Sequence, residues 1–178
     1  MGVLKGARSV KMNLKLMTVT MGICFSIILS GCSSEEESVV QKESSHEGHS
    51  KHTVSGDLQE ETSSKEIAPD FLAEKPEDMK TIYLAAAQNK DLLEKIPCYC
   101  GCGESANHKN NYDCFIHENK KNGEVVWDDH GTRCGVCLEI AAQSILDLND
   151  GMSVKEIRNK VDEKYKSGYA KPTPTPEV

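Results

Sequence analysis

The chain has 178 residues and a formal net charge of −7, and aromatic residues make up only 5% of it, so little aromatic area is available for a core. This acidic balance argues against nucleic acid as a partner and leaves no polybasic patch for anionic lipid. Apart from the thiols of its eight cysteines, the sequence shows no nucleophile–base pair, phosphate loop or paired-carboxylate signature. The composition therefore favours a binding protein over an enzyme.

The N-terminus has the pattern of an export signal. Its positive charges lie on Lys5, Arg8, Lys11 and Lys15. The apolar stretch from Met17 to Leu29 is shorter than the roughly 20 residues of a membrane-spanning helix, but it suits a signal peptide. The segment Leu29-Ser30-Gly31-Cys32 that follows resembles the bacterial lipobox, in which the cysteine is acylated and the chain is cut before it. The resemblance implies a signal peptide over 1–31 and a lipid on Cys32 that holds the protein on the extracytoplasmic face of the cell membrane.

Two segments have the composition of disordered chain. Residues 32–69 are rich in Ser, Glu, Lys and His and poor in large apolar side chains, which predicts a disordered tether. Three histidines of this tether, His46, His49 and His52, are spaced so that they could loosely bind Cu(II), Zn(II) or Ni(II), unless they cluster by chance. At the other end, residues 171–178 alternate Pro with Thr and predict an extended tail.

The remaining residues, 70–170, predict a small, mainly α domain of three helices. Apolar residues recur near the helical period over 76–96, and Pro97 would end this first helix. The same period predicts a second helix over 134–149 and a third over 153–167.

Two further features belong to this domain. Ser153 and Glu156 have the spacing of a capping box at the start of the third helix. Residues 98–133 form a long, Cys-rich irregular connection between the first two helices, with one strand-like run at 124–127. A connection of this length is uncommon in a compact domain unless function or a cross-link orders it.

The Cys-rich connection and the start of the second helix hold six cysteines, namely Cys98, Cys100, Cys102, Cys114, Cys134 and Cys137. The run Pro-Cys-Tyr-Cys-Gly-Cys-Gly from Pro97 to Gly103 resembles the motif of a family of bacterial lipoproteins named PCYCGC after it. The resemblance covers residues 76–169, and it implies no specific activity because that family has been described mainly by its motif.

The spacing of the thiols predicts a metal site. Cys98, Cys100 and Cys102 can converge if the backbone wraps, and Cys134 and Cys137 share one face at a helix start, where the thiolate form is favoured. Such sites select soft or borderline ions, so Cu(I) is favoured and Zn(II) is the second candidate. Cys114 would be a further ligand. Three histidines lie in the same connection, His108, His117 and His130, and of these His117 and His130 are the candidates for a remaining place. The predicted function is delivery or sequestration of metal.

Two alternatives remain open for the same cysteines. In an exported protein, three disulfides could staple an interaction domain. A redox-active dithiol is the other alternative, because Cys134-Gly-Val-Cys137 and the helix after it resemble the thiol-reducing component of cytochrome c maturation. That likeness does not extend to the PCYCGCG half, and it would make the protein an extracytoplasmic thiol–disulfide oxidoreductase or its accessory.

Overall fold

The computed structural model describes residues 50–178, so the predicted signal peptide, Cys32, His46 and His49 lie outside the described residues. In this part of the chain the regular elements are β1 (Ser50–His52), β2 (Leu58–Thr62), η1 (Asp70–Leu72), α1 (Glu77–Gln88), α2 (Lys90–Leu93), α3 (Cys102–Ser105), η2 (Tyr112–Cys114), β3 (Ile116–Asn119), β4 (Val125–Asp128), η3 (Asp129–Arg133), α4 (Gly135–Asn149) and α5 (Val154–Tyr165), where η marks a short 3-10 helix. None of its helices has the length and apolar character needed to cross a membrane.

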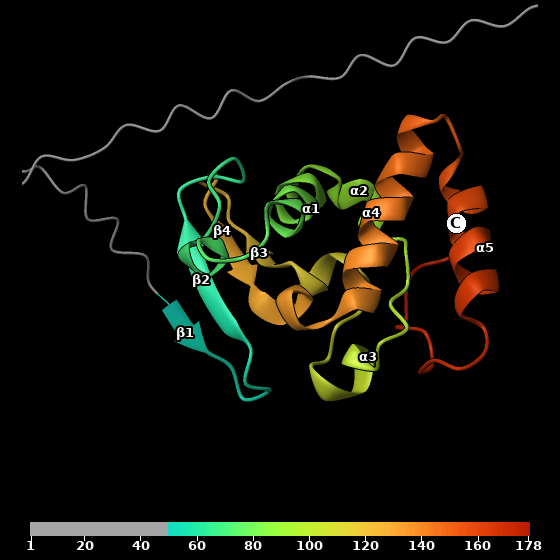
Figure 1. Cartoon of the computed structure of the whole chain (residues 1–178), viewed down its shortest axis with the longest axis horizontal. Helices are drawn as coiled ribbons and strands as arrows, with labels where there is room; N and C mark the ends of the chain where they lie inside the picture. The colour runs from blue at the N-terminus through green and yellow to red at the C-terminus, as the bar shows by residue number, and fades with distance from the viewer. Residues whose placement is uncertain (1–49) are drawn as a thin grey trace, which may run out of the picture. The chain divides into compact units, whose positions relative to one another are not determined.

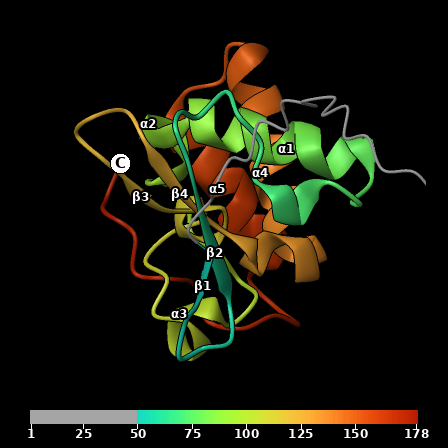
Figure 2. The same ribbon diagram turned by 90° about the vertical axis from the view of Figure 1, so that its left-hand side faces the viewer.

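The strands form one antiparallel sheet in the order β1-β2-β4-β3. Figure 1 shows the sheet at one side of residues 50–178, with α1 and α4 next along and α5 farthest from the strands. Figure 2 looks from the strand side, with β1 and β2 in front of the helices. Strand β4 belongs to the Cys-rich connection, and β2 pairs with it. A segment far upstream in the sequence therefore lies beside that connection.

The prediction of a mainly α domain of three helices was wrong, because the fold is a mixed α/β structure with a four-stranded sheet. The predicted disorder is also wrong for 50–69, which contains β1 and β2. Polar partners hold β2 in place of apolar burial: Gln59 donates to the Asp128 carboxylate, and Thr62 accepts from the Trp127 indole N–H at 2.7 Å. A composition test for disorder detects missing apolar area, but it does not detect backbone pairing or specific polar contacts.

The three predicted helices are present with one change. Helices α4 and α5 match the predicted ranges, and α5 begins with the predicted capping box of Ser153 and Glu156. The predicted helix over 76–96 is instead divided into α1 and α2 at Asn89, whose side-chain amide donates to the carbonyl of Ala85 at 2.8 Å. This bond competes with the backbone ladder, which periodicity does not detect.

The core extends from the sheet through α1 to α4 and α5, and its largest aromatic side chains lie between α1 and the strands. Tyr83 of α1 packs edge-on against Phe115, with ring centroids 4.9 Å apart, and lies 6.4 Å from the ring of Trp127. All three side chains are fully buried. The Tyr83 hydroxyl donates to the carbonyl of Asp128 at 3.0 Å, which ties α1 to the end of β4. Because η3 and α4 follow β4 in the chain, these contacts hold the point at which η3 begins.

Candidate metal centre

The PCYCGC segment makes a tight turn that enters α3. Gly101 has a φ of +93°, a conformation that favours glycine, and α3 starts at Cys102 directly after it. The backbone of Cys98 is bonded on both sides to Thr173: its N–H donates to the Thr173 hydroxyl at 2.9 Å, and its carbonyl accepts from the Thr173 N–H at 3.0 Å. The C-terminal segment therefore packs along the motif (Figure 1).

Three thiols form a compact triangle. The Sγ atoms of Cys98 and Cys100 are 3.5 Å apart, and the Sγ atom of Cys137 lies 3.4 Å from each of them. Cys98 and Cys137 are fully buried, whereas Cys100 is partly exposed. Cys137 lies in the first turn of α4, so the triangle joins the PCYCGC turn to that helix.

Two thiols and two imidazoles form a second group beside the triangle. The ligand atoms of Cys102, Cys114, His108 and His130 all lie within 4.8 Å of one another. The two Sγ atoms are 3.7 Å apart, and the two imidazole ring centroids are 4.7 Å apart. Cys114 is fully buried in η2, while Cys102 begins α3. Segments that are separate in the sequence thus supply a mixed sulfur and nitrogen donor set.

His130 is oriented toward the thiols by its neighbours. Asp128 accepts the His130 backbone N–H at 3.0 Å, and Gly131 lies so close to Phe115 and Tyr83 that a Cβ there would clash. Nδ1 of His130 lies 3.2 Å from the Asp57 carboxylate, and Nε2 lies 3.8 Å from the Sγ atom of Cys100. A carboxylate on one ring nitrogen with the other nitrogen aimed at the donors is the usual arrangement of a metal-ligating histidine.

Hydrogen bonding and burial shift the pKa values of the thiols in this cluster in opposite directions. Hydrogen bonding from Cys102 and Cys114 lowers the pKa of the Cys100 thiol far below its usual value, whereas burial raises the pKa of Cys114 well above it. Burial, followed by the neighbouring His130, lowers the pKa of His108. His108 is therefore held as the neutral imidazole, which is the form that binds metals.

The thiol separations suit a metal site. With metal–sulfur bonds of about 2.3 Å, two thiolates on a tetrahedral ion lie about 3.8 Å apart. The sulfur–sulfur separations of 3.4 to 3.7 Å are within a few tenths of that value. They are also far longer than the roughly 2.05 Å of a disulfide bond, and the six cysteines of the described chain are all free thiols.

The predicted ligands divide into those inside and those outside this cluster. Five of the six cysteines and His130 are brought together. Cys134 precedes α4 as a half-buried residue, outside the close groups found among residues 50–178. The nearby Cys100 raises the pKa of the Cys134 thiol. His117 is exposed on β3 and is likewise outside those groups.

Three residues near the thiols, His108, Asp57 and Asp128, are not among the ligands that the sequence favours. The sequence favours His117 and His130 over His108, although His108 follows Cys102, the last cysteine of the motif, at a short distance along the chain. Asp57 was missed because it lies in the segment predicted to be disordered. Asp128 was missed because its role depends on the end of β4 lying beside η3.

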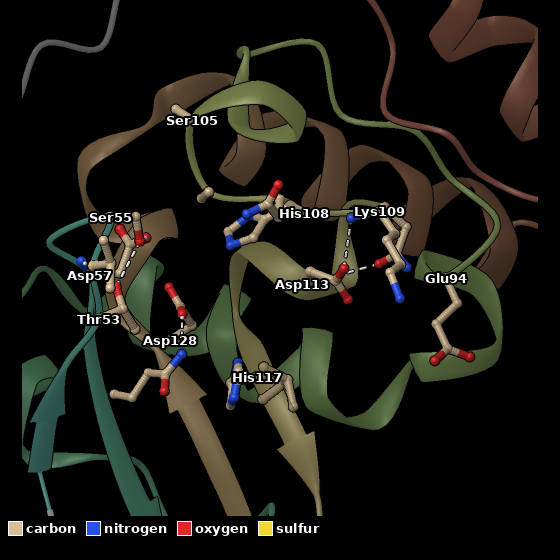
Figure 3. A pocket seen from close by; sticks show the side chains of 16 residues that line it. Thr53, Ser55, Asp57, Glu94, Ser105, His108, Lys109, Asp113, His117 and Asp128 are labelled. Atoms are coloured by element: carbon tan, nitrogen blue, oxygen red, sulfur yellow. Dashed lines mark hydrogen bonds between the residues drawn. The ribbon is translucent and has the colours of Figure 1, made fainter.

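A polar cavity of about 660 Å³ lies beside the second group. Figure 3 shows His108 in this cavity, with Asp128 and Asp57 to one side of it and His117 across from it. The ligand atoms of Asp57, His108 and Asp128 also lie within 4.8 Å of one another. The cavity therefore gives solvent and ions a polar path to His108.

The model of one protein family, described as proteins of unknown function with a PCYCGC motif, matches residues 21–178. The chain belongs to this family, which confirms the resemblance indicated by the motif. No curated protein and no solved structure matches the chain.

Proposed function

We propose that this member of the PCYCGC-motif family is a lipid-anchored extracytoplasmic protein that binds copper as Cu(I) for delivery or sequestration. The observation that carries the proposal is the triangle of Cys98, Cys100 and Cys137, whose three Sγ atoms are 3.4 to 3.5 Å apart. Several thiols this close together in a buried site are explained by a shared ion, since an ion satisfies thiolates that would otherwise repel one another.

Copper is favoured over zinc by the donor type. Three thiolates without a carboxylate form a soft site, and soft ligands select Cu(I). Zinc remains the second candidate because the adjoining donors include imidazoles, which suit Zn(II). When bound, the ion would replace the thiol protons of the triangle and join the PCYCGC turn to α4.

The anchor part of the proposal depends on the sequence before residue 50. The lipobox-like Leu29-Ser30-Gly31-Cys32 supports acylation of Cys32, with the membrane as the partner of the lipid. A Cys32→Ala variant should lose acylation and remain unprocessed, as measured by metabolic labelling with a fatty acid and by the mass of the membrane-bound protein. A wild-type mature protein without a fatty acid would contradict this part alone.

The oxidoreductase alternative has one supporting feature, the Cys134–Cys137 pair at the start of α4. Two observations weigh against it. Cys137 is fully buried inside the thiol triangle, and the pKa of Cys134 is raised by Cys100, whereas reactive dithiols have an exposed thiol of lowered pKa. Metal binding is therefore the better interpretation of these cysteines.

The direct test is a competition titration of the full chain, reduced and freed of metal, against chelators of known affinity for Cu(I) and Zn(II). Wild-type protein should bind Cu(I) with a Kd tighter than about micromolar. The Cys100→Ser/Cys137→Ser variant should lose most of this affinity, whereas Cys134→Ser, a matched change at a cysteine outside the triangle, should retain it. If the wild type takes up neither ion at that level, the metal proposal is wrong. Reversible cycling of Cys134 and Cys137 alone with a dithiol reductant would then support the oxidoreductase.

A further inference from the structure

We infer that the cluster holds two ions at once, Cu(I) between Cys98, Cys100 and Cys137 and Zn(II) between Cys102, Cys114, His108 and His130. This inference rests on the proposed function and adds to it a second site, its ligands and its metal. The two ligand sets share no residue, and the sulfur–sulfur distances within them are 3.4 to 3.7 Å, although other combinations of the same donors, such as Cys98, Cys114 and Cys137, also lie within 4.8 Å of one another.

The number of donors is the first argument. Five thiols and two imidazoles lie in the two groups, whereas a tetrahedral ion takes about four ligands. A single ion would leave three of these donors without a partner. Divided into the thiol triangle and the second group, the same seven donors make one three-coordinate and one four-coordinate site.

The second argument is the unpaired imidazole of His108. This side chain is only 8% exposed, and its Nδ1 atom is buried with no hydrogen-bond partner among the described residues. A buried polar atom without a partner is rare. Since a ring nitrogen of this same imidazole lies within 4.8 Å of two thiols and a second imidazole, the unpaired side chain indicates a missing ligand. An ion confined to the triangle would not supply it, because His108 belongs to the other group.

Charge supports the assignment of the two metals. Zn(II) with two thiolates and two neutral imidazoles is formally neutral, which suits the fully buried Cys114. Tetrahedral sites with two sulfur and two nitrogen ligands are typical of zinc. The soft three-thiolate site suits Cu(I), and its remaining negative charge is tolerated more easily because one of its three ligands, Cys100, is partly exposed to solvent. The two sites adjoin where Nε2 of His130 lies 3.8 Å from the Sγ atom of Cys100.

The test counts ions and identifies their ligands in the full chain, reduced and loaded with Cu(I) and Zn(II) together. Native mass spectrometry should find one of each ion per chain. X-ray absorption should find only sulfur around copper, and both nitrogen and sulfur around zinc. This measurement on the wild type does not depend on whether any variant folds.

Variants then separate the two sites. Cys98→Ser/Cys137→Ser should keep zinc and lose copper, whereas Cys114→Ser/His108→Ala should keep copper and lose zinc. His117→Ala, at an exposed histidine outside both groups, should keep both ions. One ion per chain at saturation, or the same ligands around both metals, would overturn the two-ion inference while leaving metal binding intact. Binding of neither ion would instead contradict the proposed function itself.

Discussion

The aromatic core and the thiol cluster are neighbours that are held together in different ways. Tyr83, Phe115 and Trp127 are fully buried against one another, so apolar area stabilises that region directly. The cluster instead gathers thiols and imidazoles from the PCYCGC turn, η2, η3 and α4, at sulfur–sulfur distances that suit a shared ion. The first region is stabilised by burial, whereas the second holds Cys and His groups that could bind a metal ion, and under our proposal that ion orders it.

Removing the metal should produce the largest difference in amide exchange between the thiol cluster and the aromatic core. Chelation of the loaded protein should increase backbone amide exchange over 98–114, because the ion that fixes the turn is gone. Amides of α1 and β4 should keep their protection, since Tyr83 and Trp127 remain buried. Hydrogen–deuterium exchange with mass spectrometry measures both regions in one sample. Equal loss of protection in both would show that the core is not independent of the cluster.

Asp57→Asn should have the next largest effect, on metal affinity. The Asp57 carboxylate lies 3.2 Å from Nδ1 of His130 and leaves Nε2 facing the thiols. Loss of such an orienting carboxylate typically weakens metal binding roughly 10–100-fold. The affinity for Zn(II), measured by chelator competition, should fall by that factor. The midpoint of thermal unfolding of the metal-free protein should stay close to that of the wild type. An unchanged affinity would show that Asp57 does not orient a ligand.

Thr173→Val should have a smaller effect because it removes one hydrogen bond. The Thr173 hydroxyl accepts from the Cys98 N–H at 2.9 Å, and valine keeps the shape of the side chain without this acceptor. The expected cost is about 1 kcal/mol in the free energy of unfolding, together with a several-fold loss of Cu(I) affinity. Thr175→Val is a matched change on the same tail. If the two variants have the same stability and the same Cu(I) affinity, the Thr173 hydroxyl does not hold the PCYCGC turn in place.

The smallest effect concerns the packing of α5 on α4, away from the cluster. Lys160 donates to both carboxylate oxygens of Asp147 at 2.8 and 2.7 Å, and this lowers the pKa of Asp147 below 3.8. A carboxyl group with a lowered pKa stabilises the fold above its unfolded pKa, and this contribution is lost as the pH falls through the folded pKa. Metal-free wild type should therefore lose stability relative to Asp147→Asn below about pH 4. Parallel unfolding curves for the two proteins across that range would contradict this.

The sequence predicted what local patterns encode and missed what depends on distant partners. The capping box at Ser153 and the apolar period of α4 were enough to place two helices. Strand β2 was missed because its polar side chains are satisfied by Asp128 and Trp127, which lie far away in the sequence.

The same distinction applies to the candidate site. The density of cysteines predicted the cluster, but choosing between His117 and His108 required the fold. His117 is exposed on β3, whereas the turn after α3 brings His108 to Cys102 and Cys114.

Elemental analysis of the native protein tests the central claim most directly. The protein, purified without oxygen from the cells that produce it, should carry tightly bound copper, with zinc beside it, and should release both only on chelation or thiol modification. Protein that is free of both metals, with its six described cysteines paired in disulfides when isolated, would contradict the account.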